Sequence, residues 1–307
     1  MDTPHQPVLL AEILDGLRVR PDHDYIDCTI GAGGHSLAIL AANGPTGRLL
    51  GLDADPAALE VARARLAAFG PRVELVHTNF QHLQIIAQEH GFVKVAGIML
   101  DLGVSSLQLD QSPRGFSFQH DARLDMRFDP AQPRTAHELV NTLPERALAD
   151  LIYTYGQERR SRRIARAIVD HRPIDSTAAL AALIEKTVGR RERIHPATRT
   201  FQALRIAVND ELGNLERALP QTVELLAPGG RLAVIAFHSL EDRLVKRFLR
   251  LAASDCICPP DLPVCRCEHT ATMQIVTPKP ITPSAAELSR NRRSRSARLR
   301  IAERLPA

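Results

Sequence analysis

Four short apolar runs separated by helix-length segments occupy the first third of the chain, and they constrain the fold more than any other feature. The runs cover Tyr25–Thr29, Arg48–Asp53, Val73–His77 and Val95–Asp101. Strands that alternate with helices pair in parallel, because each helix returns the chain to the same edge of the sheet. The sequence therefore predicts an α/β fold with a doubly wound, mostly parallel sheet.

This alternation stops near Leu109 and resumes near Gly213. Between them, four segments have apolar residues at helical spacing: Pro144–Tyr155, Glu158–Asp170, Thr177–Val188 and Thr198–Asn209. Afterwards we expect helices over Leu215–Leu226 and Leu240–Leu251, strands over Arg231–Phe237, Met273–Val276 and Ala297–Ala302, and loop in most of Ser254–Arg295. We therefore predict a sheet domain (1–108 and 214–307) interrupted by an inserted all-helical domain (109–213).

Glycines and an acid follow the first two predicted strands. The first strand leads into Gly31-Ala32-Gly33-Gly34, and the second ends at Asp53. Glycines let the backbone approach a ligand closely, and a carboxylate at a strand end can bind the hydroxyls of a ribose. An adenosine-containing cofactor is therefore expected. A nicotinamide dinucleotide stays open, although the G-x-G-x-x-G pattern would need glycine where Ser36 stands.

Two further predicted strands end in polar residues, Asp101 and His238. Ligands of open α/β sheets lie at the carboxyl ends of the strands, so both side chains are candidates for the active site. Each has a purely structural alternative. Asp101 could cap a turn, and the spacing of Ser239 and Asp242 resembles a helix N-terminal cap.

Arginines are concentrated in three places, although the net charge of the chain is only +4. The clusters are Arg159, Arg160, Arg162, Arg163 and Arg166; then Arg190, Arg191 and Arg193; then Arg290, Arg292, Arg293, Arg295, Arg298 and Arg300. Arginine binds phosphate through a planar fork of donors, so the clusters favour a polyanionic partner over merely solvated helix faces. Neither a secretory signal nor a membrane-spanning run is evident, and we expect a cytoplasmic protein with no membrane partner.

Four of the five cysteines form two closely spaced pairs, Cys256-x-Cys258 and Cys265-x-Cys267. Four thiols could hold zinc, but zinc-binding pairs are usually separated by two residues rather than one. The alternative is a reduced surface loop. No metal is assigned from the sequence.

Several long motifs resemble those of the ribosomal RNA small subunit methyltransferase H family (RsmH or MraW). They include Gly33-Gly34-His35-Ser36, Asp101-Leu102-Gly103-Val104-Ser105-Ser106, Gln108-Leu109-Asp110, Arg114-Gly115-Phe116-Ser117-Phe118, His195-Pro196-Ala197-Thr198-Arg199-Thr200-Phe201-Gln202 and Phe237-His238-Ser239-Leu240-Glu241-Asp242-Arg243. The resemblance runs through nearly the whole chain. It implies a Rossmann-like, class I methyltransferase that uses S-adenosylmethionine.

The resemblance further implies methylation of the exocyclic amino nitrogen (N4) of a cytidine in the decoding region of 16S ribosomal RNA. It implies cofactor contacts at Gly33, Gly34, His35, Asp53, Phe80, Asp101 and Gln108, and substrate recognition by the inserted domain. We assign the chemistry to Asp101 and His238, and RNA binding to Arg159, Arg160, Arg162, Arg163, Arg166 and Arg199. Left open are a homodimer, and whether free rRNA or the small ribosomal subunit is the substrate.

The usual Pro-Pro-aromatic motif of amino-group methyltransferases is absent, because Leu102-Gly103-Val104 follows Asp101. An aromatic wall for the base would then come from Phe116, Phe118 or Phe237, although phenylalanine is more often buried in a core. Two other readings stay open: a nicotinamide-dependent oxidoreductase and a non-catalytic RNA-binding protein.

Overall fold

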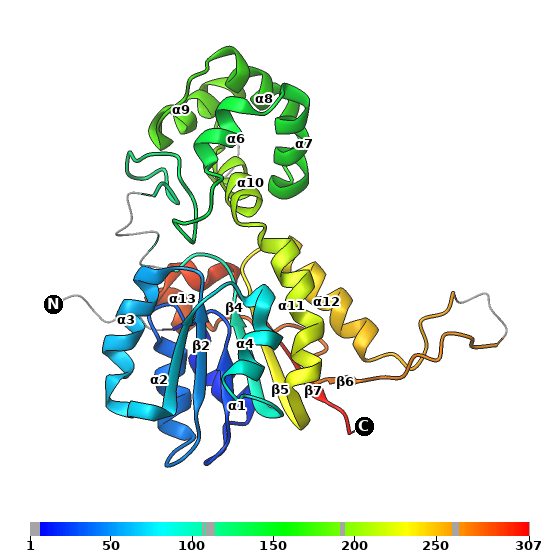
Figure 1. Cartoon of the computed structure of the whole chain (residues 1–307). Helices are drawn as coiled ribbons and strands as arrows, with labels where there is room; N and C mark the ends of the chain where they lie inside the picture. The colour runs from blue at the N-terminus through cyan, green and yellow to red at the C-terminus, as the bar shows by residue number, and fades with distance from the viewer. Residues whose placement is uncertain (1–6, 106–107, 109–113, 191–193, 260–263, 307) are drawn as a thin grey trace. The chain divides into compact units, whose positions relative to one another are not determined.

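A computed structural model describes residues 7–105, 108, 114–190, 194–259 and 264–306 (Figure 1). It divides the chain into two compact units, Met1–Gly103 with Leu212–Ala307, and Val104–Glu211. The inserted unit thus begins a few residues before the expected 109, because Val104 already packs against the helical core. No helix among the described residues is long and apolar enough to cross a membrane.

The first unit is built on a seven-stranded sheet in the order β3-β2-β1-β4-β5-β7-β6. Its strands are β1 (Tyr25–Asp27), β2 (Leu49–Asp53), β3 (Val73–His77), β4 (Val95–Asp101), β5 (Leu226–Ala236), β6 (Met273–Ile275) and β7 (Arg298–Arg304). β1 to β5 are parallel, whereas β7 runs antiparallel to β5 and to β6. The predicted fold class is therefore confirmed. Strand order reverses between β1 and β4, where a doubly wound sheet opens its ligand crevice.

Helices cover both faces of this sheet, which makes its central strands apolar on both sides. The helices are α1 (Leu10–Leu17), α2 (Gly34–Ala42), α3 (Pro56–Leu66), α4 (Leu83–Glu89), α11 (Glu211–Leu225), α12 (Ser239–Ala252) and α13 (Ala285–Arg290). Successive residues of β4 enter opposite cores: Ile98 and Leu100 pack in one and Met99 in the other. This period of two explains why the strand reads as one uninterrupted apolar run.

The main differences from the expected elements lie at the start of β5 and between β6 and β7. β5 begins at Leu226 and continues through Pro228-Gly229-Gly230, which we expected to separate a helix from the strand. The pairing with β4 skips from Leu226 to Arg231, so the extra residues form a bulge, and Gly229 adopts φ 77°. The helical segment after β3 consists of a 3-10 turn (Phe80–His82) followed by α4. The stretch expected to be mostly loop contains α13.

The second unit is helical in its described part. It contains α6 (Ala136–Thr142), α7 (Glu145–Gly156), α8 (Ser161–Asp170), α9 (Thr177–Val188) and α10 (Thr198–Asn209) around one apolar core. A Cβ on Gly156 would lie 2.5 Å from the carbonyl oxygen of Arg199, so glycine permits the close approach of α7 and α10. The short helix α6, which starts with a Thr135–Glu138 capping box, is not among the expected helices.

Candidate active site

The glycine turn after β1 adopts a backbone that most residues avoid. Gly31 and Gly33 have φ of 51° and 75°, and Gly33 caps the start of α2. A Cβ on Gly34 would lie 2.5 Å from the Pro7 side chain. Positive φ and lack of space both favour glycine here, which leaves backbone rather than side chain at the end of β1.

Asp53 connects this turn to the end of β2. One carboxylate oxygen accepts a 2.8 Å hydrogen bond from the Gly31 amide, and the other accepts a 2.8 Å bond from the Asp55 amide. Burial raises the pKa of Asp53 to about 6. Two backbone donors therefore fix the orientation of a carboxyl group beside the glycine turn, although its contact with a ribose stays a prediction.

A third strand-end acid, Asp27, was not singled out from the sequence. It ends β1 with 1% exposure, and it accepts a 2.6 Å hydrogen bond from the Ser36 hydroxyl and a 3.1 Å bond from the Thr29 amide. Burial raises its pKa to about 6. Its position, an acid directly before the glycine turn, is the sequence signal that could have identified it.

Asp101 ends β4 and lies next to His35 of α2. Its backbone amide donates to the Thr29 hydroxyl (2.6 Å), and its Oδ2 lies 3.7 Å from His35 Nδ1. The other ring nitrogen of His35 is 2.9 Å from the Val8 carbonyl oxygen. Within the described structure, the buried Oδ1 of Asp101 has no hydrogen-bond partner. Burial, then the charges of Asp27 and Glu241, raise the pKa of Asp101 to about 8.

His238 follows β5 and caps α12. Its Nδ1 accepts from the Glu241 amide (3.3 Å), and its Nε2 lies 3.2 Å from Glu241 Oε1, while Oε2 of Glu241 accepts from the Phe237 amide (2.8 Å). The structure does not support the alternative in which Ser239 and Asp242 cap this helix, because His238 is its N-cap. Asp242 instead binds Arg300 at 2.7 Å and Arg298 at 3.0 Å. Because Nδ1 accepts a hydrogen bond, Nε2 carries the ring proton in neutral His238 and is a donor.

The capping role of His238 can be separated from chemistry by substitution. Asparagine is among the best N-cap residues. The free energy of unfolding of His238→Asn should therefore lie within about 0.5 kcal/mol of that of the unsubstituted protein, whereas His238→Ala should lower it by about 1 kcal/mol. Urea unfolding measures both. If His238→Asn were stable and yet inactive in methyl transfer, the ring would act in the reaction itself.

Of the other predicted cofactor residues, Phe80 lies in the same unit and Gln108 does not. Phe80 opens the turn that follows β3 and packs partly against an apolar core. Gln108 belongs to the helical unit, where its side-chain oxygen accepts from the Ser105 amide at 3.0 Å. The first unit therefore carries Gly33, Gly34, His35, Asp53 and Asp101 around the end of β1 and its neighbours, with Phe80 after β3.

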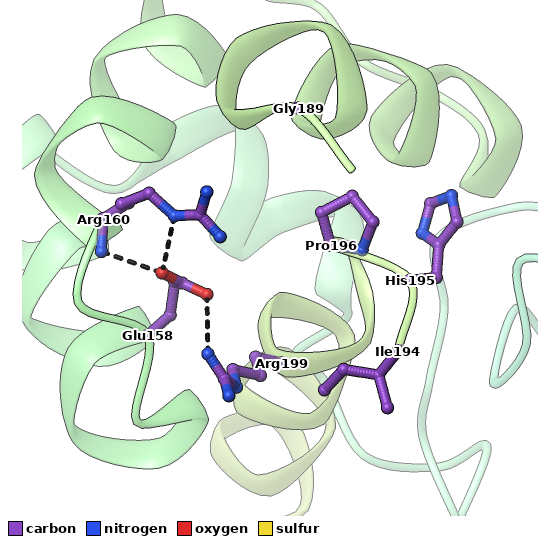
Figure 2. Close-up of a pocket in the computed structure, with 7 residues that line it drawn as sticks. All are labelled: Glu158, Arg160, Gly189, Ile194, His195, Pro196 and Arg199. Atoms are coloured by element: carbon purple, nitrogen blue, oxygen red, sulfur yellow. Dashed lines mark hydrogen bonds and ion pairs between the residues drawn. The ribbon is translucent and has the colours of Figure 1, made fainter. Parts of the chain in front are cut away.

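The arginines assigned to RNA binding fall into two kinds. Arg160 and Arg199 flank the buried Glu158, at 3.3 and 3.4 Å, and line a small pocket with Gly189, Ile194, His195 and Pro196 (Figure 2). The two arginines hold the pKa of Glu158 below its usual value. These ion pairs occupy some of the N–H donors of Arg160 and Arg199, so fewer donors remain for an RNA phosphate.

The remaining arginines of this cluster are exposed. Arg159, Arg162 and Arg163 form no ion pair within the described part of the chain, and Arg166 pairs with Glu145 at 3.5 Å. Elsewhere, Arg298 and Arg300 are held by Asp242, while Arg191 and Arg193 lie outside the described residues. Among the described arginines of the three clusters, Arg160, Arg298 and Arg300 are therefore held by buried carboxylates.

Two of the three aromatic candidates for stacking on a base lie in the helical core. Phe116 stacks on Phe128 with 5.6 Å between ring centres, and Phe118 meets Phe201 edge to face at 5.0 Å. Phe237 is partly buried at the end of β5, in the same unit as Asp101. It alone of the three belongs to the sheet unit.

The chain is similar to known proteins over nearly its whole length. The sequence pattern of the MraW methylase family matches residues 2–305. A protein of Dehalococcoides mccartyi called "Ribosomal RNA small subunit methyltransferase H" is 55% identical over 303 residues, covering 98% of this chain and 87% of that protein. The protein of the same name from Thermomicrobium roseum is 55% identical over 309 residues, covering 99% and 95%.

Among solved structures, a putative rRNA-methylase from Clostridium thermocellum aligns with a TM-score of 0.46 at 14% identity, covering 98% of this chain and all of that one. The family match and the sequence identities confirm the resemblance found in the motifs and, with it, the S-adenosylmethionine cofactor. The chain belongs to the MraW methylase family.

Proposed function

We propose that this protein transfers a methyl group from S-adenosylmethionine to the N4 amino nitrogen of a cytidine in the decoding region of 16S ribosomal RNA. The names of the relatives support small-subunit ribosomal RNA as the substrate. The observation that carries the choice of an amino nitrogen is Asp101. It is a strand-end carboxyl group whose Oδ1 has no hydrogen-bond partner in the described structure.

The residues around the end of β1 fit the cofactor. The sulfonium of S-adenosylmethionine supplies an electrophilic methyl group and carries a positive charge. Asp27, Asp53 and Asp101 place three carboxyl groups at neighbouring strand ends, and burial raises the pKa of each. A cation relieves that cost of ionisation. We assign Gly33 and Gly34 the role of letting the backbone lie close to the cofactor, and Asp53 the role of binding the ribose hydroxyls.

Asp101 is suited to a weakly nucleophilic amino group. The lone pair of the cytosine N4 is delocalised into the ring, and the nitrogen must lose a proton once it has gained a methyl group. An ionised Asp101 Oδ1 can accept a hydrogen bond from that amino group and then take its proton. His238 presents a donor rather than an acceptor at Nε2, so we assign it to positioning the end of β5.

The environment of Cys28 argues against methylation at a ring carbon. The C5 carbon of cytosine becomes nucleophilic only after a thiolate has added to C6. Cys28 lies directly after β1, but it is 1% exposed, and burial raises the pKa of its thiol well above its ordinary value. The other four cysteines lie together in the connection between α12 and β6. An amino nitrogen needs no such nucleophile.

The target base must leave its stack to reach the cofactor, and its phosphates need cationic partners. We assign phosphate binding mainly to Arg159, Arg162 and Arg163, which are exposed, and stacking on the base to Phe237. Arg160, Arg166 and Arg199 contribute less, because carboxylates already bind them.

The decisive experiment incubates the purified protein with labelled S-adenosylmethionine and either small ribosomal subunits or free 16S rRNA, then identifies the labelled nucleoside by mass spectrometry. N4-methylcytidine at one site is the expected product. Label on C5 would exclude the proposed chemistry. No transfer to either substrate, with cofactor bound, would favour a non-catalytic RNA-binding protein. Calorimetry with a nicotinamide dinucleotide tests the oxidoreductase alternative.

The pKa values of the three acids predict a pH-dependent cofactor affinity. Asp27 and Asp53 have a pKa of about 6 and Asp101 about 8, whereas such groups ionise near pH 4 in an unfolded chain. The folded protein without cofactor thus holds extra protons between about pH 4 and pH 8, and its free energy of unfolding falls as pH rises through this window.

Binding of a cation should expel those protons, so affinity for S-adenosylmethionine should rise with pH, up to about pH 6 through Asp27 and Asp53 and up to about pH 8 through Asp101. The rise should be about tenfold for each unit by which binding lowers a pKa. Titration calorimetry at several pH values measures this rise. S-adenosylhomocysteine, whose sulfur is uncharged, is the matched control and should change less. Equal pH dependence for the two compounds would contradict a role for the carboxylates at the sulfonium.

A further inference from the structure

Four cysteines outside the proposed active site gather in one place. They lie in the connection between α12 and β6, shown in orange in Figure 1. The four Sγ atoms all lie within 4.8 Å of one another, and they belong to Cys256, Cys258, Cys265 and Cys267. Methyl transfer uses none of them, because no step of that reaction needs a thiol or a metal.

The spacing of the sulfurs fits one tetrahedral metal ion. Cys267 Sγ lies 3.6 Å from Cys265 Sγ and 3.8 Å from Cys256 Sγ. Four thiolates bound to zinc at about 2.3 Å form a tetrahedron with edges of about 3.8 Å. A disulfide bond would need about 2.05 Å between two sulfurs, and an iron–sulfur cluster inserted between the thiolates would hold them further apart.

Backbone amides already point at three of these sulfurs. The Cys258 amide donates to the Cys256 sulfur, the Ile257 amide to the Cys267 sulfur, and the Arg266 amide to the Cys258 sulfur. Each nitrogen lies 3.4 Å from its sulfur. The first of these bonds bends the chain within one Cys-x-Cys pair, which turns both sulfurs to one side despite the single intervening residue. Hydrogen bonds to thiolate sulfurs orient metal ligands and stabilise their negative charge.

The described residues of the connection have no apolar core to hold them. Its ends are tied by a 2.8 Å hydrogen bond from the Thr272 amide to the Ala252 carbonyl oxygen. None of its described residues between these two joins an apolar core, and Ile257 and Val264 are 50% and 67% exposed. A segment of this size without a core needs a crosslink or a metal to hold one conformation.

We propose that Cys256, Cys258, Cys265 and Cys267 bind one zinc ion that orders the connection between α12 and β6. Zinc is favoured over other divalent metals because four thiolates in tetrahedral geometry form a closed, structural site without an open position. The usual two-residue separation is thus not required here, since the local turn at Cys256 and Cys258 brings the paired sulfurs together.

Elemental analysis of the full-length protein, purified without chelator after growth with added zinc, should give one zinc per chain. Cys256→Ser/Cys258→Ser and Cys265→Ser/Cys267→Ser should each retain less than a tenth of it. Cys28→Ala, which removes a cysteine buried elsewhere, should retain all of it. Iron in place of zinc, two disulfides by mass spectrometry, or four free thiols without metal would each overturn the assignment.

A second measurement does not depend on metal analysis. Trypsin cleaves after Arg266, which lies between two of the ligands. Cleavage there should be at least tenfold faster in either double variant, or after a strong chelator, than in the zinc-loaded protein. The unfolding temperature of the variants should change little, because the connection lies outside the cores. Equal cleavage rates with and without zinc would show that no metal orders this segment.

Discussion

Asp101→Asn should lower the rate of methyl transfer by about 10²- to 10⁴-fold, the range for losing a general base. The amide can still accept a hydrogen bond from the amino group but cannot take its proton. The fold should survive, because the change removes a carboxyl group whose pKa burial raises to about 8 and whose Oδ1 has no hydrogen-bond partner in the described structure. Single-turnover rates with saturating S-adenosylmethionine measure the effect on chemistry alone.

A matched control for this substitution is Asp22→Asn. Asp22 precedes β1, at the opposite end of the strand from the glycine turn, and binds the amide and hydroxyl of Thr46. Asparagine tolerates its left-handed backbone (φ 60°). This variant should methylate at the normal rate. An unchanged rate in Asp101→Asn, with cofactor bound, would remove Asp101 from the reaction.

The pH profile should distinguish the base from a merely structural acid. If Asp101 acts ionised, the single-turnover rate should rise with pH and then level off above the pKa of Asp101 in the cofactor complex, which the bound sulfonium should place below the value of about 8 in the protein without cofactor. The residual rate of Asp101→Asn should lack that rise. The same profile in both proteins would assign the titration to another group.

Replacing Arg159, Arg162 and Arg163 together by alanine should weaken RNA binding about 10- to 100-fold at low salt. If each arginine neutralises one phosphate of a single strand, the slope of log K against log salt should fall by about 2 units. Stability should change little, because these side chains are exposed and form no ion pair in the described part of the chain. Fluorescence anisotropy with an RNA fragment over a range of salt concentrations measures both quantities.

The control for this variant removes the same charge elsewhere on the helical unit. Arg134, Arg146 and Lys186 are also exposed, and their triple alanine variant should bind RNA with nearly unchanged affinity and slope. Equal losses in the two variants would mean that net charge, and not the cluster around α8, governs binding. Cofactor affinity should be unaltered in both, because no cofactor residue is touched.

The sequence was sufficient for the sheet because its pattern is local. β4 reads as an apolar run because both of its faces are buried. The start of α3 is equally local, because Pro56 occupies its first turn and the Asp55 side chain accepts a hydrogen bond from the Ala57 amide. Parallel pairing follows from the alternation of strands and helices. β5 was mispredicted at its start, since a Pro-Gly-Gly stretch normally ends an element and only pairing with β4 retains it as a bulge.

The candidate site was harder to predict, because each side chain there depends on partners distant in sequence. The strand-end acids and glycines were visible as residue types, but that His35 faces Asp101, or that Asp53 binds the Gly31 amide, depends on which strands are neighbours. The cap of α12 could not be read from the sequence for the same reason. Asp242 is held by arginines of β7, more than fifty residues away, which leaves His238 and Glu241 to cap α12.

By itself the sequence determined the order of strands and helices, the family and the cofactor, because these follow from local periodicity and from long motifs. Only the tertiary structure decided which charged groups are available. It buried Asp27, paired Arg160 and Arg199 with Glu158, and brought together four cysteines whose spacing alone did not predict a metal site. The physical reason is that burial and ion pairing are properties of neighbours in space, and residue type and spacing along the chain do not specify them.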